Sequence, residues 1–283
     1  MRVRGKGPGL IGLATAVLLA PLPATAQAGG GQARESRVVR EASGLEWRGR
    51  IQEAEALLEE FLAESPTSSA GLFALERVLR TQGRVGEVLP WADRYLEGDP
   101  SSSAVRYMKL RVLVDEDSLA ALGPAADAWF AAEPGTPDPY REVARLYQRA
   151  LGSEAALAVL EKGQETLSQP GVLALAVGDI RAEMGDGPGA AREWARALED
   201  PDTEVGAVLR RVGGLEGDPQ QLAPPLLDAL AGGPTLEHRQ AAVEVAIGFG
   251  MDDDAVELGR ALLEELPPGE RSGFLLGVAT RAA

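Results

Sequence analysis

Apolar residues along most of this chain recur at the i, i+3, i+4 and i+7 spacing of an amphipathic helix. The segment with Ala54, Leu57, Leu58, Phe61 and Leu62 shows this period, and the alternation typical of strands is absent. Segments of about 12–15 residues with this period are separated by short stretches that contain glycine or proline, which end helices. The pattern therefore predicts an all-α protein made of many short helices.

Two series of residues mark the ends of these segments. The first is Pro66, Pro100, Pro134, Pro170, Pro201, Pro234 and Pro267. The second lies between its members and is Gly49, Gly83, Asp117, Gly152, Gly185, Gly217 and Gly250. Both series have a mean spacing of 33.5 residues. They predict seven repeats, each with a helix A, a tight turn, a helix B and a turn marked by proline.

The marks give the expected helix positions. Helices of class A are expected at 36–48, 69–82, 103–114, 138–151, 171–184, 203–214 and 236–249. Helices of class B are expected at 51–64, 86–98, 119–133, 153–167, 188–200, 219–231 and 253–266. One helical hairpin cannot bury its apolar face alone, so neighbouring hairpins must stack. Residues 268–283 are expected to form a further helix that caps the last hairpin.

With these features the chain resembles the tetratricopeptide repeat (TPR) family over residues 35–267. Repeats started at residues 35 and 171 match the family pattern at Ala42, Gly49, Ala54, Leu58, Pro66, Gly178, Gly185, Ala190, Trp194 and Ala197. Phe61, Tyr95 and Trp129 occupy a place where the family prefers alanine, which leaves open a related solenoid of the Sel1-like or generic TPR-like type. The resemblance implies a right-handed superhelical solenoid whose A helices line a concave groove and whose B helices form the back.

The beginning of the chain has the pattern of a secretory signal peptide, expected at residues 1–26. Three cations at positions 2, 4 and 6 precede an apolar run from Leu10 to Ala20, and Ala24-Thr25-Ala26 fits a cleavage site. Residues 27–34 are expected to be a flexible lead-in. This pattern predicts an exported protein, periplasmic or secreted, without a membrane span after cleavage.

Composition excludes several kinds of chemistry. The chain has no cysteine and one histidine, so thiolate nucleophiles, Cys-ligated metals and multi-His sites are excluded. No phosphate loop, dinucleotide-binding motif or nucleophile elbow is present, and His238 is interpreted as an exposed residue at a helix start. We therefore predict no catalytic residue, no cofactor and no metal. The net charge of −15 also disfavours nucleic acid as a partner.

The charge is unevenly divided between the two helix classes. The A helices carry 15 basic and 10 acidic residues, whereas the B helices carry 5 basic and 22 acidic residues. The groove implied by the resemblance is therefore the basic side of an acidic protein. The arginines expected to face it are Arg77, Arg80, Arg111, Arg141, Arg145, Arg149 and Arg211. Arg141, Arg145 and Arg149 form one stripe, because an i, i+4, i+8 spacing follows one helix face.

Two interpretations of this stripe remain open. In the first it binds carboxylates, since guanidinium pairs with them bidentately. In the second it is charge balance, with Asp138 and Glu142 pairing to Arg141 and Arg145 at i, i+3. The carboxylate clamp known in the family also uses asparagine, and the chain has none. Tyr107, Tyr140 and Tyr147 stand on A helices as further groove candidates, while Trp47, Trp91, Trp129 and Trp194 are expected in the core.

These observations favour a non-enzymatic scaffold of the cell envelope that binds a peptide or an acidic protein segment in an arginine-lined groove. One alternative is an accessory protein that binds an anionic envelope polymer or assists an envelope assembly enzyme. Another is an enzyme or a helical domain of a larger hydrolytic assembly, which the absence of catalytic motifs from the sequence disfavours. The sequence leaves the oligomeric state open.

Overall fold

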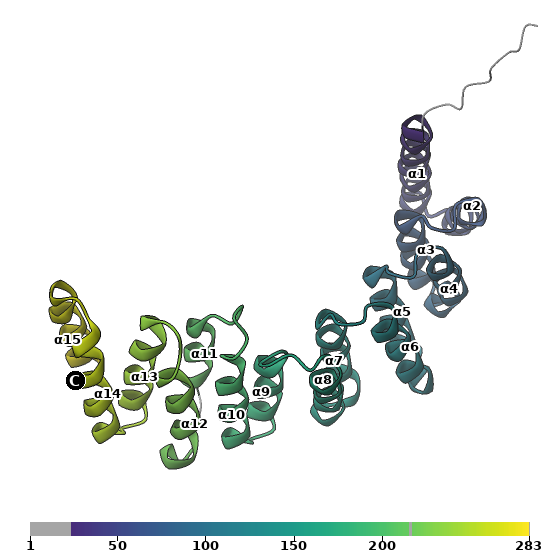
Figure 1. Cartoon of the computed structure of the whole chain (residues 1–283). Coiled ribbons are helices and arrows are strands. Elements are labelled where there is room, and N and C mark those ends of the chain that lie inside the picture. The colour runs from purple at the N-terminus through teal and green to yellow at the C-terminus, as the bar shows by residue number, and fades with distance from the viewer. Residues whose placement is uncertain (1–23, 215–216, 283) are drawn as a thin grey trace, which may run out of the picture. The chain divides into compact units, whose positions relative to one another are not determined.

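A computed structural model describes residues 24–214 and 217–282, which form fifteen α-helices, one short 3₁₀ helix and no strand. The predicted all-α fold is confirmed. The chain divides into two compact units, residues 1–78 and 79–283, and each is considered by itself (Figure 1). Most of the predicted signal peptide, residues 1–23, lies outside the described residues.

The first unit holds the first hairpin, made of α1 (Ala24–Trp47) and α2 (Ile51–Glu64), and most of α3 (Ser69–Thr81). Ala42, Leu58 and Leu75 form part of its core and are fully buried. The structure differs from the expected flexible lead-in, because α1 begins at Ala24 and includes residues 27–34. Arg34 contributes to this longer helix by pairing with Glu64 of α2, and its guanidinium lies 5.6 Å from the centre of the Phe61 ring.

The second unit continues the hairpins in chain order. After the 3₁₀ helix η1 (Val85–Val88) come α4 (Leu89–Gly98), α5 (Ser103–Asp115), α6 (Leu119–Ala132), α7 (Asp138–Leu151), α8 (Ser153–Leu167), α9 (Ala174–Glu183), α10 (Gly187–Ala197), α11 (Val205–Val212), α12 (Pro219–Ala231), α13 (Leu236–Gly248), α14 (Asp252–Glu265) and α15 (Pro268–Ala282). Most bounds lie within two residues of the expected ones. The helix expected at 86–98 is interrupted, because Pro90 stands in the first turn of α4.

The turn residues behave as the spacing predicts. All seven members of the glycine and aspartate series have positive φ, from 51° at Asp117 to 149° at Gly217. Six prolines of the other series lie between a B helix and the next A helix, and Pro267 lies between α14 and the terminal helix α15. The helix expected at 171–184 starts late, at Ala174, because Gly171 and Leu173 also have positive φ, 72° and 62°. In the described residues, left-handed turns thus join the two helices within each hairpin, and proline-marked turns join one hairpin to the next.

Stacking of the hairpins buries the apolar faces. In the second unit, α7 packs on α8, α9 on α10, α12 on α13 and α13 on α14, and α5 also packs on α7, α10 on α12 and α11 on α13. One core cluster surrounds Trp129 and includes Phe130 and Tyr140, whose rings stack with centroids 4.1 Å apart. A second surrounds Trp194 and Leu226. Tyr140 is therefore a core residue rather than a groove residue.

The aromatic predictions have a mixed outcome. Trp129 and Trp194 are buried as expected, with 2% and 3% of their surfaces exposed, and Trp91 is half-buried. The expectation for Trp47 is wrong: 93% of its surface is exposed. Trp47 is the last residue of α1, two positions beyond the buried Leu45, and the turn at Arg48 and Gly49 follows it directly.

His238 also differs from its interpretation as an exposed residue. It is buried near the start of α13, and its Nδ1 lies 2.7 Å from the Thr235 hydroxyl oxygen. The backbone N–H of His238 donates to the same oxygen, so Thr235 caps the helix while His238 contacts the cap in return. The histidine therefore has a structural role at this helix start.

Candidate functional site

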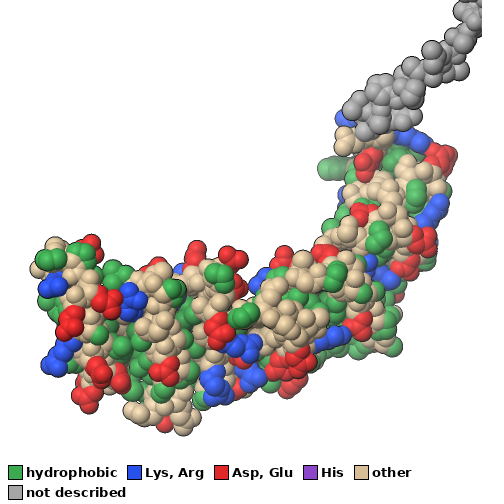
Figure 2. Space-filling model, viewed as in Figure 1, with side chains coloured by type: hydrophobic (Ala, Val, Ile, Leu, Met, Phe, Trp, Pro, Cys, Tyr) green, Lys and Arg blue, Asp and Glu red, His purple; other side chains and the backbone are tan. Residues whose placement is uncertain are grey.

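Three of the seven predicted arginines line one cavity of about 380 Å³ in the second unit: Arg141, Arg145 and Arg211. Figure 2 shows basic and acidic side chains interleaved along this unit, although the chain as a whole is acidic. Most of the lining comes from the A helices α7, α9 and α11.

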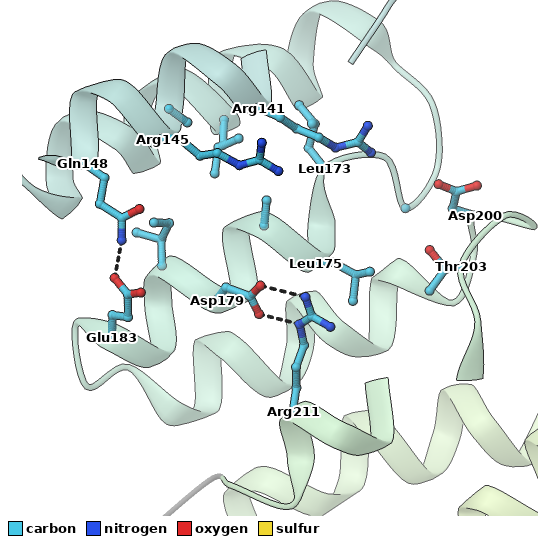
Figure 3. A pocket seen from close by; sticks show the side chains of 15 residues that line it. Arg141, Arg145, Gln148, Leu173, Leu175, Asp179, Glu183, Asp200, Thr203 and Arg211 are labelled. Carbon is cyan, nitrogen blue, oxygen red and sulfur yellow. Dashed lines mark hydrogen bonds and ion pairs between the residues drawn. The ribbon is translucent and has the colours of Figure 1, made fainter. Parts of the chain in front are cut away.

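The cavity residues occupy single faces of two helices. On α7 they are Arg141, Ala144, Arg145 and Gln148, spaced i, i+3, i+4 and i+7. On α9 they are Leu175, Ala176, Asp179, Ile180 and Glu183, and Leu160 and Leu173 complete an apolar floor. Arg141 and Arg145 project into the space opposite Leu175 (Figure 3). The cavity thus joins an apolar floor to two guanidinium groups.

Arg211 is held in place by the protein itself. Its Nε and Nη2 donate to the two carboxylate oxygens of Asp179 at 2.6 and 2.9 Å, and its Nη1 donates to the carbonyl of Ala207 at 2.9 Å. The hydrogen bonds to Asp179 raise the pKa of the Arg211 guanidinium above its ordinary value. Asp179 also accepts from the indole Nε1 of Trp194 at 3.1 Å. Arg211 therefore braces one wall of the cavity through its bond with Asp179.

Arg141 and Arg145 have weaker partners. Each makes one contact with an acidic residue three positions earlier, Asp138 at 3.0 Å and Glu142 at 2.7 Å. The pairs required by the charge-balance interpretation are thus both formed. Such exposed pairs are worth only about 0.2–0.5 kcal/mol. Side-chain exposures of 36% for Arg141 and 66% for Arg145 leave both groups accessible.

The other four predicted arginines do not line this cavity. Arg149 donates to the Tyr107 hydroxyl at 3.0 Å, and Arg80 pairs with Asp115 at 2.7 Å. Arg111 is half-buried on α5. Arg77 belongs to the first unit, where it binds both carboxylate oxygens of Glu46 at 3.1 and 2.7 Å. Three of the seven predicted arginines thus line the cavity in the second unit, and the prediction that the seven share one groove stays a prediction.

The prediction missed the acidic lining residues Asp179, Glu183 and Asp200. A signal for two of them exists in the repeat itself. Asp179 binds Arg211, 32 residues away, and Glu183 accepts a hydrogen bond from Gln148, 35 residues away. Both separations are close to one repeat, so the polar partner of an A-helix residue stands at a similar place in the neighbouring repeat.

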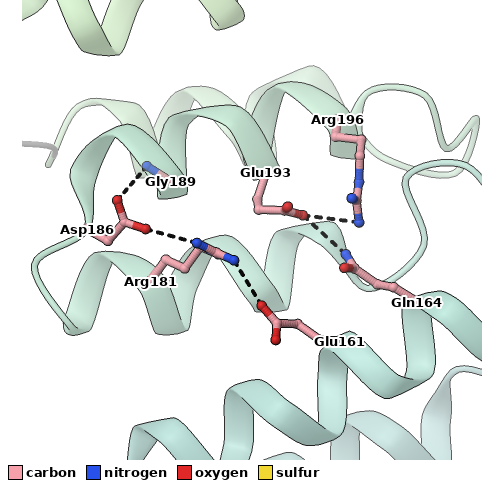
Figure 4. A network of polar contacts seen from close by, with 7 residues as sticks. All are labelled: Glu161, Gln164, Arg181, Asp186, Gly189, Glu193 and Arg196. Atoms are coloured by element: carbon pink, nitrogen blue, oxygen red, sulfur yellow. Dashed lines mark hydrogen bonds and ion pairs between the residues drawn. The ribbon is translucent and has the colours of Figure 1, made fainter.

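A polar network on the other side of α9 fixes that helix to α8 and α10 (Figure 4). Arg181 of α9 pairs with Glu161 at 2.9 Å and with Asp186 at 3.0 Å. Asp186 caps α10 by accepting the backbone N–H of Gly189 at 2.8 Å. Together these contacts position the α9 face that carries Leu175 and Asp179.

We expect Asp186→Ala to lower the free energy of unfolding by about 1 kcal/mol, the usual value of an N-cap. The Gly189 N–H bond, and next the Arg181 guanidinium, hold the pKa of the Asp186 carboxyl below its ordinary value. The stabilisation should therefore be complete above the unfolded-state pKa of about 4 and disappear as pH falls through the lower folded-state pKa. Urea unfolding of both proteins between neutral and acidic pH tests this, and a difference that does not shrink in acid contradicts it.

Among residues 24–214 and 217–282, no group of three or more acidic or histidine side chains is placed to hold a metal ion. In the same part of the chain, no helix combines the length and apolarity needed to cross a membrane.

The helix order and packing define an all-α, TPR-like solenoid of helical hairpins. No protein-family model matches the chain, and no curated protein matches it. Among solved structures, PilF from Pseudomonas aeruginosa is similar at 15% identity and a TM-score of 0.38, over 88% of this chain and 99% of PilF. MamA from Desulfovibrio magneticus has 19% identity and a TM-score of 0.36, over 58% of this chain and 94% of MamA.

A thermophilic TPR protein from Thermus thermophilus has 19% identity and a TM-score of 0.34, over 62% of this chain and 96% of its own. Because these values are low, the fold assignment rests on the helices of this chain and on their contacts.

Proposed function

We propose that the chain is a non-enzymatic interaction scaffold that binds an acidic segment of a partner protein in the cavity between α7 and α9. The observation that supports this most is the pair Arg141 and Arg145 above an apolar floor. The volume of about 380 Å³ falls within the range of about 300–1,000 Å³ usual for ligand sites. A cavity of this volume and lining suits a carboxylate side chain next to an aliphatic side chain.

The small stabilisation from the present ion pairs of Arg141 and Arg145 favours their replacement by pairs with a carboxylate of the partner. Their present ion pairs are exposed and contribute little, whereas a bidentate guanidinium–carboxylate pair is stronger and has a defined geometry. The wall opposite needs no rearrangement, because Arg211, Asp179 and Trp194 already hold one another. Binding of this kind should be of modest affinity and should weaken as salt screens the charges.

The proposed place of action is the cell envelope, either periplasmic or secreted, after removal of residues 1–26. This rests on the signal-peptide pattern of the sequence alone. An accessory protein for an anionic envelope polymer is the second candidate. It is favoured by Arg149, which extends the α7 stripe beyond the cavity.

We expect Arg141→Glu combined with Arg145→Glu to weaken binding of acidic peptides at least about tenfold, since each lost charge-assisted hydrogen bond is worth about 1.5–3 kcal/mol. The probe is an array of peptides in which glutamates flank aliphatic residues, read by fluorescence anisotropy. A matched array has glutamine in place of glutamate.

The control is Arg192→Glu with Arg210→Glu, which changes the net charge equally at two exposed arginines outside the cavity. Far-UV circular dichroism should show native helicity for both variants. The proposal fails if the glutamine array binds equally well or if both variants lose the same affinity. Retention of purified anionic cell-wall fragments without peptide binding would favour the second candidate.

A further inference from the structure

The cavity between α7 and α9 has an acidic end as well as its two arginines. Asp200 and Thr203, from the loop between α10 and α11, line the cavity there. The Asp200 carboxylate lies at the same end of the cavity as the Arg141 guanidinium (Figure 3). Within the described residues no ion pair joins these two groups, because the acidic partner of Arg141 is Asp138. The cavity therefore presents charges of both signs to a ligand.

Backbone contacts hold the Asp200 carboxylate at this end. Gly171 lets the loop approach closely, since an added Cβ there would lie 2.6 Å from the Asp200 backbone nitrogen. Asp200 Oδ1 accepts the Asp202 N–H at 3.0 Å, and the Asp200 carbonyl accepts the Thr203 N–H at 2.9 Å. The other carboxylate oxygen, Oδ2, has no hydrogen-bond or ion-pair partner within residues 24–214 and 217–282. One oxygen of a fixed carboxylate is thus left for a ligand.

The other two acidic residues of the cavity are already engaged by side chains of the protein. Asp179 binds Arg211, and Glu183 accepts a hydrogen bond from Gln148. Asp200 differs from both, because the contact to its carboxylate comes from a backbone N–H and not from a cation. It is also half-buried, so salt screens a charge beside it less than on an exposed surface. Asp200 is therefore the acidic lining residue best placed to bind a cation of a partner.

The rest of the loop makes this end of the cavity more negative. Four acidic residues stand within six positions there: Glu199, Asp200, Asp202 and Glu204. None of them has an ion-pair partner in the part of the chain that the structure describes. A segment with acidic side chains only would be repelled where it passes this loop, because like charges placed side by side oppose binding. A segment with a cationic side chain at this end would be attracted instead.

We propose that the partner segment bound in this cavity carries a cation close to its carboxylate. The carboxylate pairs with Arg141 and Arg145, and a lysine or arginine of the same segment pairs with Asp200. This inference rests on the proposed function and defines the chemistry of the partner more closely. Both attraction and repulsion contribute to the selectivity, since the α10–α11 loop disfavours a second acidic side chain where it favours a basic one. The cavity then selects a segment of mixed charge over a purely acidic segment.

The test compares two sets of peptides with acetylated and amidated ends, so that only side chains carry charge. Every peptide has one glutamate beside an aliphatic residue. The first set has a lysine at a distance of one to four positions on either side of the glutamate, and the second has glutamine in its place. Fluorescence anisotropy at constant ionic strength should show the best lysine peptide binding at least about fivefold more tightly than its glutamine counterpart. This value lies between the effects of an exposed ion pair and of a charge-assisted hydrogen bond.

Variants of the loop assign this preference to one carboxylate. Asp200→Asn should abolish the preference for lysine, while it keeps an oxygen that can accept the Asp202 N–H. The matched control is Asp202→Asn, which removes the same charge from the same loop at an exposed residue outside the cavity. It should leave the preference at its wild-type value. Asp200→Lys should reverse the preference, so that a peptide with a second glutamate in place of the lysine binds more tightly than the lysine peptide.

Equal binding of the lysine and glutamine peptides to the wild-type chain would overturn the inference, and so would equal effects of Asp200→Asn and Asp202→Asn. In both cases the proposed function still stands if Arg141→Glu with Arg145→Glu weakens binding of the glutamate peptides. If no peptide that contains glutamate binds the wild-type chain, the inference and the proposed function fail together.

Discussion

Replacing Trp129 with alanine is expected to lower the free energy of unfolding by about 3–5 kcal/mol, the range for a large aromatic residue in a core. Only 2% of its surface is exposed, and it packs in the cluster that contains Leu122 and Leu160. Its indole Nε1 also donates to Glu133 at 2.8 Å, so truncation leaves a cavity and removes a hydrogen bond. Urea unfolding followed by far-UV circular dichroism measures the loss.

The matched control is Trp47→Ala. Since 93% of the Trp47 surface is exposed, we expect the free energy of unfolding to change by no more than about 0.5 kcal/mol. Both variants remove the same side chain, so the comparison isolates burial. Equal losses from the two variants would contradict the described packing.

Gly178→Ala is expected to lower the free energy of unfolding by about 1–3 kcal/mol, as overpacking of a filled core does. An added Cβ would lie 2.4 Å from the Trp194 indole, which is buried and hydrogen-bonded to Asp179. The same substitution at Gly259 inside α14, where an added Cβ meets no atom within 4 Å, should instead raise stability by about 0.5–1 kcal/mol.

A double-mutant cycle with Trp194→Phe identifies the cause. The smaller ring leaves room for the methyl group, so the cost of Gly178→Ala should fall when both changes are present. Thermal unfolding of the four proteins gives the coupling energy. A cost that is the same in both backgrounds would show that the indole is not what excludes the methyl group.

Much of the fold follows from local features of the sequence. The turn positions were predictable because left-handed turns favour glycine and because proline ends a helix, and the seven marked turns all have the expected backbone. Gly178 and Trp194 both fit the family pattern, and the structure places them side by side, since a Cβ added at Gly178 would lie 2.4 Å from the Trp194 ring. These features depend on residues close in sequence or on a repeated pattern.

The burial of individual residues, by contrast, depends on where neighbouring helices end. Helical spacing assigns Trp47 to a face of α1, but it does not show that this residue stands at the end of the helix beside an open turn. Helical spacing also does not predict the burial of His238, whose ring contacts the Thr235 hydroxyl.

The acidic side of the candidate site was not predicted, for a related reason. Arginine spacing on one helix predicts the basic stripe, whereas the acidic wall comes from α9 and from Asp200, in the next repeats. The bond between Asp179 and Arg211 makes one predicted ligand residue into a structural brace.

The proline-marked turns between hairpins also determine how this molecule tolerates changes in length. A single residue inserted inside a helix rotates everything after it by about 100° and moves the apolar face away from its neighbours. A whole repeat of about 33 residues, removed between two proline-marked turns, rejoins a B helix to an A helix through the same kind of turn. The length of this protein can therefore change by complete hairpins, which makes the hairpin its natural unit for recombination and design.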